Sequence, residues 1–317
     1  MKAAIIGIGN MGKNHVRVYS EISSITLVAL SDLNETLGTQ LAEKHHTKFY
    51  RDYEEMLEKE EIDLVSVCVP TSLHFKVASY CLKKKVHTLL EKPITSNIND
   101  AQKLINLAKR NKVKLLVGHI ERYNPALRQV KEIVDSGILG RIIAITSRRV
   151  GGFPPQIKDV DVAVDLAIHD IDISNYLLGE LPTNISVNKQ LNHTRRRPDS
   201  VEFFLKYKRA SSYIQANWIS PVKIRKLNIT GSEGYLEMDY ISQKIEIYKS
   251  NYSKFKEESS NFSDYVLLFS EPDITNVSVK KKEPLKEEIL FFIDCIKNNI
   301  DLDSLFALKA LEISLKK

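Results

Sequence analysis

The chain has 317 residues, of which 43% are hydrophobic and 27% are charged. Such a chain exceeds one ordinary domain, and its near-average composition argues against wholesale disorder or a membrane bundle. No apolar run approaches the roughly 20 residues that span a bilayer, and glycines interrupt the apolar start Ala3 to Ile8. We therefore expect neither a membrane partner nor a signal peptide, and we expect cytoplasmic residence.

The cysteines and the net charge exclude further classes of protein. Cys68, Cys81 and Cys295 lack the close spacing of zinc or redox sites, so we interpret them as buried thiols. The net charge of +6 suits ligands that bear phosphate but does not demand nucleic acid, which we do not expect as a partner. The basic run Arg195-Arg196-Arg197 is either a solvated loop or a contact for an anionic substrate.

From Lys2 to His119, short apolar runs alternate with helical patterns, which is typical of βαβ units and predicts a doubly wound parallel sheet. The expected strands are Ala3 to Ile6, Thr26 to Ser31, Leu64 to Val69, Val86 to Leu90 and Lys114 to Val117. The expected helices are Met11 to Ile22, Glu35 to His45, Tyr53 to Glu58, Leu73 to Lys84 and Ile98 to Arg110.

After His119 the pattern changes to long strands flanked by helices. We expect helices at Asn124 to Asp135, Val160 to Leu178, Pro284 to Asn298 and Ser304 to Leu315. Strands are expected at Asn184 to Leu191, Val201 to Tyr207, Ser211 to Trp218, Lys226 to Thr230, Tyr235 to Asp239 and Lys244 to Tyr248, with a mobile polar loop from Asn251 to Ser263. Their alternation of polar and apolar residues predicts a mostly antiparallel sheet with one exposed face.

A glycine-rich segment follows the first strand and opens the first helix: Gly7-Ile8-Gly9-Asn10-Met11-Gly12. In this context the pattern predicts a dinucleotide site, with the phosphates at the helix start. Asp32 ends the second strand, where a carboxylate accepts hydrogen bonds from the adenosine ribose and repels the extra phosphate of NADP. We therefore predict an NAD-binding Rossmann domain over residues 1–119. The alternative is that the glycines only make a turn and Asp32 only caps a helix.

Two later strand ends supply further candidates for the cofactor site. Pro70 and Thr71 follow the third strand, where ligands collect in open α/β sheets, and His74 lies nearby. The structural alternatives are N-capping by Thr71 and simple packing of His74. Glu91-Lys92-Pro93 stands where the fifth strand should end beside the dinucleotide, so Glu91 and Lys92 are predicted to contact it, and a lysine there has a chemical use.

The segment from Asp165 to Asp172 supplies the remaining chemistry. Asp165 and His169 are four residues apart and Asp172 follows three later, so they can share a helix face. Oxidation of an alcohol needs a base, which His169 can provide at neutral pH while Asp165 orients its ring. Lys92 can donate to the reacting oxygen, and this assignment joins the two predicted domains at one cleft.

The same segment is compatible with two roles outside catalysis. It can be an amphipathic helix with a structural acid and a satisfied inward histidine. A metal site is also conceivable from Asp165, His169, Asp170 and Asp172, but neighbouring residues on a helix diverge, so His169 and Asp170 do not easily serve one ion. We predict no metal.

Four motifs together resemble the glucose-fructose oxidoreductase/inositol dehydrogenase/MocA family, over nearly the whole chain: Gly7 to Gly12, Glu91-Lys92-Pro93, Arg122-Tyr123-Asn124-Pro125 and Asp165 to Asp172. The resemblance implies a Rossmann domain followed by an α+β domain over residues 120–317, whose open sheet forms a homodimer or homotetramer. It also implies that Lys92, Asp165 and His169 are catalytic.

Within that family, Gly118 to Pro125 and Arg148 to Pro155 resemble members that act on UDP-linked amino sugars. The function implied is oxidation by NAD of a sugar secondary hydroxyl, the C3 hydroxyl of UDP-N-acetylglucosamine or a related UDP-sugar. Arg122, Asn124, Arg148 and Arg149 join Asp165 and His169 as predicted substrate contacts, the two later arginines through the diphosphate. Those arginines can instead be alternating strand residues in water. Dehydrogenation of inositol or a free sugar, and a non-catalytic sensor of NAD and sugar, are the alternative functions.

Overall fold

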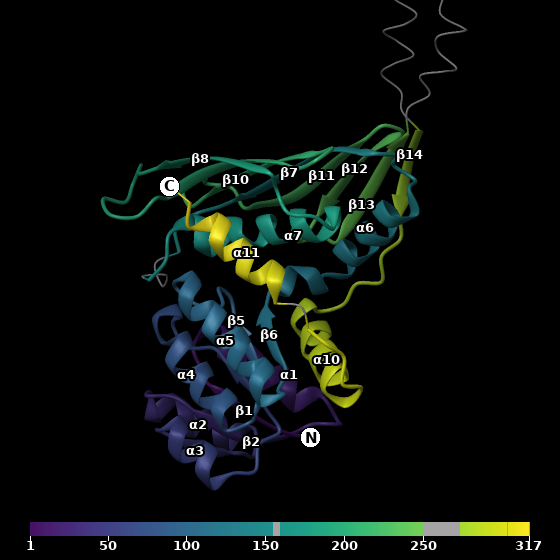
Figure 1. Ribbon diagram of the computed structural model, residues 1–317. Coiled ribbons are helices and arrows are strands. Elements are labelled where there is room, and N and C mark those ends of the chain that lie inside the picture. The colour runs from purple at the N-terminus through teal and green to yellow at the C-terminus, as the bar shows by residue number, and fades with distance from the viewer. Residues whose placement is uncertain (155–158, 250–272, 303, 317) are drawn as a thin grey trace, which may run out of the picture. The chain divides into compact units, whose positions relative to one another are not determined.

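The computed structural model describes residues 1–154, 159–249, 273–302 and 304–316. The chain folds into two compact units (Figure 1). The first combines Met1–Tyr123 with Glu283–Lys316 and a short stretch ending at Val160, and the second combines Asn124–Pro155 with Asp161–Lys282. The last two helices therefore belong with the N-terminal unit, whereas the sequence placed them in the second domain. The expected loop from Asn251 to Ser263 lies outside the described residues.

The first unit is built on a parallel sheet of six strands in the order β3-β2-β1-β4-β5-β6. Its strands are β1 (Lys2–Ile6), β2 (Thr26–Ser31), β3 (Lys48–Tyr50), β4 (Leu64–Val67), β5 (His87–Glu91) and β6 (Leu115–Gly118). Strand order reverses on either side of β1, which is the doubly wound topology predicted from the sequence. Strand β3 was not predicted, because its three residues are too few to show a periodicity.

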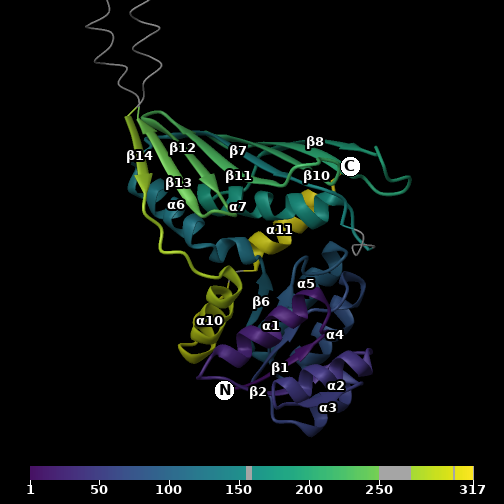
Figure 2. The ribbon, with the colours of Figure 1, turned by 180° about the vertical axis from the view of Figure 1, so that it is seen from behind.

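The helices of this unit pack against the sheet or against one another. They are α1 (Asn10–Glu21), α2 (Glu35–Lys44), α3 (Tyr53–Lys59), α4 (Thr71–Lys83), α5 (Ile98–Asn111), α10 (Pro284–Lys297) and α11 (Leu305–Ser314), with a 3-10 turn at Ile120–Tyr123. Helix α10 lies beside α1 (Figure 2) and buries Ile289 and Phe292 in the same hydrophobic cluster as Ile5 and Val16. Burial of this apolar stripe explains why a helix so late in the chain joins the first unit.

The second unit contains an eight-stranded sheet in the order β14-β13-β12-β11-β7-β10-β9-β8. Its strands are β7 (Ile142–Val150), β8 (Asn184–Gln190), β9 (Ser200–Lys206), β10 (Ser211–Asn217), β11 (Ile224–Gly231), β12 (Gly234–Asp239), β13 (Lys244–Lys249) and β14 (Asp273–Val277). Adjacent described strands pair antiparallel, except β7 with β10. The predicted open, mostly antiparallel sheet is confirmed, although β7 and β14 were missed.

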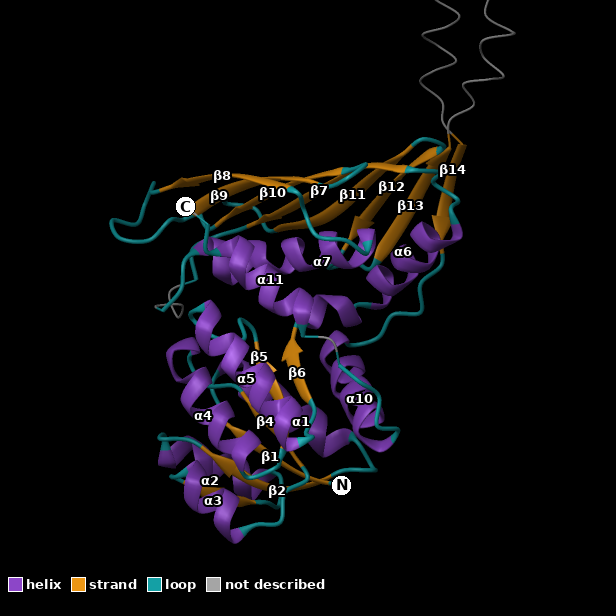
Figure 3. Ribbon diagram, in the orientation of Figure 1, coloured by secondary structure: helices purple, strands orange, loops and turns teal. Residues whose placement is uncertain are grey.

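Helices α6 (Pro125–Ser136) and α7 (Ile168–Leu178) line one face of this sheet (Figure 3). Leu127 and Val130 of α6 and Ile173 of α7 pack in one cluster with Ile229 and Leu236 of the sheet. A π-helical turn, Ala163–Ala167, leads directly into α7. The opposite face carries exposed side chains such as Phe204 and Tyr213, which are 48% and 42% exposed.

Candidate functional site

The three glycines after β1 serve three different geometric needs. Gly7 has a φ of +86°, in the left-handed region that glycine adopts without strain. A Cβ on Gly12 would lie 1.9 Å from the carbonyl oxygen of Gly7, so only glycine permits this approach of helix to loop. A Cβ on Gly9 would meet nothing within 4 Å, so the backbone there lies open to a ligand. The arrangement matches the geometry that a pyrophosphate requires.

The first turn of α1 is left without a side-chain cap. Gly9 occupies the cap position, and no acidic residue lies in the first turn. In contrast, side chains cap α2, α3, α5 and α6, through Asn34, Asp52, Asn97 and Asn124. The amide groups at the start of a helix need acceptors and attract anions, so the start of α1 fits the phosphates of a dinucleotide.

Asp32 lies at the end of β2, beside the glycine loop. Its Oδ2 atom accepts from the amide of Ile8 at 2.7 Å, and its Oδ1 atom accepts from the amide of Asn34 at 2.8 Å. Each carboxylate oxygen has a second lone pair, so hydroxyl donors of a ribose can still be accepted. The negative charge at this position disfavours an added phosphate, which is consistent with NAD as the cofactor.

His74 ties together two loops at the same edge of the sheet. Its Nδ1 atom is 2.7 Å from the carbonyl oxygen of Pro93, and its Nε2 atom is 2.9 Å from that of Val69. The ring is 1% exposed, and this burial lowers the pKa of His74. Thr71 begins α4, and its amide donates to Asp159 at 2.8 Å. His74 therefore supports the loop that carries Pro70 and Thr71, and a direct contact with the cofactor stays a prediction.

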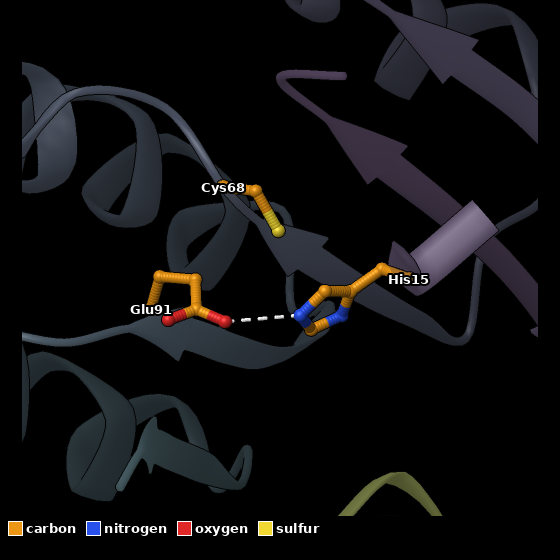
Figure 4. A group of neighbouring side chains, drawn as sticks. All are labelled: His15, Cys68 and Glu91. Carbon is orange, nitrogen blue, oxygen red and sulfur yellow. Dashed lines mark hydrogen bonds and ion pairs between the residues drawn. The ribbon is translucent and has the colours of Figure 1, made fainter. Parts of the chain in front are cut away.

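Glu91, at the end of β5, belongs to a buried cluster with His15 and Cys68 (Figure 4). The Nε2 atom of His15 lies 3.0 Å from Oε1 of Glu91, and its Nδ1 atom lies 3.1 Å from Oγ of Ser66. The cluster of His15, Cys68 and Glu91 offers metal-ligand atoms within 4.8 Å of one another. Both nitrogens of His15 are engaged in hydrogen bonds, and burial raises the pKa of the Cys68 thiol well above its usual range. The donor set therefore fits a hydrogen-bond network better than a metal site.

Lys92 comes directly after Glu91 and is partly exposed. Burial raises the pKa of Glu91, but the hydrogen bond from His15 and the charges of His15, Lys92 and His74 outweigh it, and the net pKa is lowered. The strand end thus presents an ionised carboxylate and, directly after it, the lysine.

In the second unit, Asp165 lies within the π-helical turn and His169 in the first turn of α7. Both residues are 8% exposed, and Asp172 is 1% exposed. A π turn inserts one extra residue and changes the phase of the side chains after it; such turns occur often at functional sites. The four-residue spacing of Asp165 and His169 predicted that they share one helix face. In the structure this spacing crosses the junction between a π turn and an α-helix, and sequence periodicity does not distinguish these two kinds of helix.

The predicted arginines do not share one surface. Arg149 is 3% exposed and donates from Nε to Oδ2 of Asp170 at 2.7 Å and from Nη2 to Oδ1 at 3.1 Å. Arg148 is exposed, and it points to the opposite face of the sheet because side chains alternate along a strand. Arg148 therefore does not lie on the face that carries α7, and a substrate contact by either arginine stays a prediction.

Arg122 and Asn124 also have observed contacts of other kinds. The guanidinium of Arg122 lies 5.5 Å from the ring centre of Phe306, within the first unit. Asn124 caps α6 by accepting from the amide of Ala126 at 3.1 Å, and its Nδ2 donates to the carbonyl of Tyr240 at 3.1 Å. Both ends of the Asn124 amide thus take part in holding the second unit together.

Several buried polar residues near the cofactor edge were not singled out from the sequence. They are His15, Tyr19, Ser66 and Glu288. His15 stands three residues after the glycine motif, and that spacing was the one available signal. The others lie in patterns that are otherwise typical of strand or helix core.

Comparisons with known proteins agree with this architecture. Residues 1–119 match the oxidoreductase family with an NAD-binding Rossmann fold, and residues 127–237 match the GFO/IDH/MocA C-terminal domain.

The described part of the chain contains no helix with the length and apolar character needed to cross a membrane.

Two curated relatives illustrate the range of the family. UDP-N-acetylglucosamine 3-dehydrogenase of Acidithiobacillus ferrooxidans is 27% identical over 248 residues, which are 78% of this chain and 77% of that protein. Myo-inositol 2-dehydrogenase of Thermotoga maritima is 32% identical over 187 residues, 57% of this chain and 55% of that protein.

A solved structure shows the same fold over almost the entire chain. The A. ferrooxidans UDP-N-acetylglucosamine 3-dehydrogenase superposes with a TM-score of 0.86 at 24% identity, covering 99% of this chain and 95% of that one. With family matches to both units and this shared fold, the chain belongs to the GFO/IDH/MocA family of NAD-binding oxidoreductases.

Proposed function

We propose that this protein uses NAD to oxidise a secondary hydroxyl of a sugar, with the C3 hydroxyl of UDP-N-acetylglucosamine or a related UDP-sugar as the preferred substrate. The observation that carries the proposal is that a carboxylate and a histidine four residues apart are both buried, Asp165 in a π turn and His169 in the first turn of α7, in a chain with an NAD-binding Rossmann unit. The similarity to UDP-N-acetylglucosamine 3-dehydrogenase over 78% of the chain supports the choice of sugar.

The reaction divides among three side chains. NAD, when bound, supplies the nicotinamide that accepts the hydride. His169 takes the hydroxyl proton as general base, since an imidazole titrates near neutral pH. Asp165 orients that ring, and Lys92 donates a hydrogen bond to the oxygen as it gains negative charge. The alcohol loses a hydride and a proton and becomes a ketone.

Binding is assigned to the remaining predicted residues. The segment Gly7 to Gly12, with Asp32, is proposed to hold NAD, together with Pro70, Thr71 and Glu91. The uncapped start of α1 and the open backbone at Gly9 support this assignment. Arg122 is the predicted substrate contact that we retain among the arginines, because the Arg149 guanidinium is already committed to Asp170. Asn124 positions the first turn of α6.

Turnover of defined substrates tests the proposal. NADH formation is followed by absorbance while NAD is supplied with UDP-N-acetylglucosamine, other UDP-sugars, inositols and free sugars. We expect the highest kcat/KM with a UDP-N-acetylhexosamine. Lys92→Ala should reduce kcat by at least about 100-fold, the typical contribution of acid–base assistance, while the Kd for NAD stays within about threefold. An absence of turnover over the whole panel would refute the assignment as a sugar dehydrogenase.

Oxidation of inositol is the second candidate function. The match to myo-inositol 2-dehydrogenase, at 32% identity, is higher in identity but covers only 57% of this chain. The same panel separates the candidates, because an inositol enzyme turns over the free polyol without any nucleotide.

We also propose that the protein forms a homodimer or homotetramer through the outward face of the eight-stranded sheet. Phe204 of β9 lies directly opposite Tyr213 of β10 in the antiparallel register, and both side chains are exposed. Adjacent exposed aromatic residues on an open sheet are typical of a surface that another copy covers.

A further inference from the structure

A cavity of about 710 Å³ lies within the first unit, between α4, α5 and the start of α3. Helices α4 and α5 pack side by side (Figure 1). The cavity is lined by one stripe of α4, from Phe75 to Lys83, and one stripe of α5, from Lys103 to Arg110, both at helical spacing. None of the residues predicted to hold NAD lines it. Small-molecule sites have volumes of about 300–1,000 Å³, so this cavity has the size of a second ligand site.

Basic side chains dominate the charge around this cavity. They are Lys76, Lys83, Lys103 and Arg110, against a single acid, Glu54. The carboxylate of Glu54 accepts from the hydroxyl of Tyr53 at 3.1 Å, and Lys103 pairs with Asp100 at 2.9 Å. Lys76, Lys83 and Arg110 form no ion pair within the part of the chain that the structure describes. A phosphate or carboxylate ligand would provide the missing acceptors.

The dipoles of the two helices explain only part of this pattern. Lys83 and Arg110 lie in the last turns of α4 and α5, where a basic side chain stabilises the end of a helix. Lys76 and Lys103 lie in the second turns of the same helices, where the dipole offers no such benefit. Their presence on the walls of one cavity therefore has another cause, and recognition of an anion is a sufficient one.

Aromatic rings supply the apolar part of the lining. Tyr53 and Tyr80 meet edge to face, with ring centres 5.7 Å apart and an angle of 90° between the planes. The Nζ atom of Lys103 lies 5.4 Å from the ring centre of Phe75, so a basic group and a ring occur together. All three rings are half-buried. Flat aromatic side chains pack well against planar ligands, and stacking on them is a common way to hold a nucleobase.

The cavity also carries a hydroxyl without a partner. Ser79 is 9% exposed, and its buried Oγ atom has no hydrogen-bond partner among the described residues. A serine within a helix can donate to the carbonyl four residues earlier, but Ser79 does not do so. Because an unpaired buried hydroxyl costs free energy, an acceptor on a ligand in the cavity would be stabilising. This observation points to a polar ligand independently of the basic side chains.

We propose that this cavity binds a nucleoside phosphate, with the base against the aromatic rings and the phosphates on the basic side chains. Such a ligand combines a planar ring with several negative charges, which is the combination that the lining complements. An acidic peptide would match the basic groups but not the rings, and a fatty acid would match the rings but leave most basic groups unused. The site is separate from the dinucleotide site and does not rest on the proposed function.

The test measures binding of ADP labelled on the ribose with fluorescent N-methylanthranilate to full-length protein. NAD is present at about 10-fold above its Kd, so that the dinucleotide site is filled and the probe reports on a second site. We expect saturable binding of one probe per chain, which unlabelled ADP displaces and which weakens at higher salt. Complete displacement of the probe by NAD would overturn the proposal.

A pair of charge reversals locates the site. Lys76→Glu/Arg110→Glu changes both walls of the cavity, and we expect the Kd for the probe to rise about 10-fold or more while the Kd for NAD stays within about twofold. Lys44→Glu/Lys109→Glu is the matched control, because these lysines lie in the last turns of α2 and α5 but outside the cavity. Equal weakening by both pairs would refute the site. If the first pair does not fold, Lys76→Gln/Arg110→Gln replaces it and should raise the Kd about threefold or more.

The identity of the ligand is tested separately from its charge. Phe75→Leu keeps an apolar side chain but removes the ring, and it should raise the Kd for ADP severalfold. Inorganic pyrophosphate and an oligoglutamate peptide carry negative charge without a base, and they should displace the probe at least about 10-fold less effectively than ADP. Displacement by either one as effective as that by ADP would overturn the assignment to a nucleoside phosphate.

Photolabelling with 8-azido-ADP in the presence of NAD gives a direct location. Peptide mass spectrometry should find the label on peptides that contain Phe75 or Tyr80. Label confined to the segment Gly7 to Gly12 would place the nucleotide in the dinucleotide site and refute the second site.

Discussion

Arg149 and Asp170 form a buried bidentate ion pair between β7 and α7, with N···O distances of 2.7 and 3.1 Å. The Arg149 guanidinium also lies 4.9 Å from the ring centre of Tyr240. Asp170 is adjacent to His169, so this pair anchors the helix turn that carries the proposed base. The sequence presented Arg149 as a partner for substrate phosphate, whereas its observed partner is internal to the unit.

Removal of one partner of this pair should destabilise the second unit. Arg149→Met leaves the Asp170 carboxylate buried without its cation, which we expect to cost about 3–5 kcal/mol in the free energy of unfolding. Urea denaturation followed by fluorescence of Trp218 reports on this unit, because Trp218 is the one tryptophan of the sequence. The double variant Arg149→Met/Asp170→Leu should recover part of the loss. Arg148→Met, on the outward face, should change stability by less than about 0.5 kcal/mol, and an equal effect of both single variants would contradict the assignment.

The glycine loop allows binding and folding to be separated. Gly9→Ala adds a methyl group into open space, so the protein should melt at nearly the wild-type temperature. The same methyl group should obstruct the pyrophosphate and raise the Kd for NAD about 10-fold or more, measured by titration calorimetry. Gly12→Ala instead forces a methyl group onto the Gly7 carbonyl and should cost about 1–3 kcal/mol of stability. Unaltered NAD affinity in Gly9→Ala would show that phosphate is bound elsewhere.

Glu288 should make the first unit less stable as the pH rises. Both of its carboxylate oxygens are buried without a hydrogen-bond partner among the described residues, and burial raises its pKa well above the usual range. In the unfolded chain a glutamate ionises near pH ~4.3. Below that pH it is protonated in both states, whereas between that pH and the folded pKa the folded state binds more protons, so stability falls as the pH increases.

Glu288→Gln removes this titration while keeping the shape of the side chain. Its stability relative to wild type should increase with pH, by up to about 1.4 kcal/mol for each unit above pH ~4.3 until the folded pKa is reached. The free energies of unfolding of both proteins are compared by urea denaturation at pH 5 and pH 8, with hydrogen exchange of the α10 amides as the readout. A constant difference between the two proteins over this range would mean that Glu288 does not titrate between the folded and unfolded states.

Self-association should depend on the outward aromatic pair. Phe204→Glu places a charge beside Tyr213 on the exposed face, where burial against another copy would remove it from water. We expect this variant to elute as a monomer in size-exclusion chromatography with light scattering, whereas wild type elutes as a dimer or tetramer. Ile138→Glu, at an exposed residue just after α6, is the matched control and should keep the wild-type state. A monomeric wild-type protein would refute the proposed interface.

The Rossmann half of the fold is largely predictable from local sequence. Strand and helix periods predicted β1, β2, β4, β5 and β6 and the helices between them to within about two residues at most ends, since strands buried on both faces are simple apolar runs. Gly7 and Gly12 lie in the turn after β1 and at the start of α1, and Asp32 directly follows β2, as predicted, because turn geometry and strand ends are local properties; their contact with NAD stays a prediction. Strand β7 was not predicted. The side chains of Ser147 and Arg149 face the core but are polar, so the strand lacks the alternation of apolar and polar residues that predicts a strand.

The sequence by itself determined the Rossmann unit, the open sheet, the position of the dinucleotide motif and the family, since each depends on short-range periodicity or on contiguous motifs. Only the tertiary structure decided that α10 joins the first unit, that Arg149 is bound to Asp170, and that His15 meets Glu91 across 76 residues of chain. These relationships depend on which buried polar groups find partners far away in sequence. That pairing is set by packing in three dimensions and leaves no periodic trace along the chain.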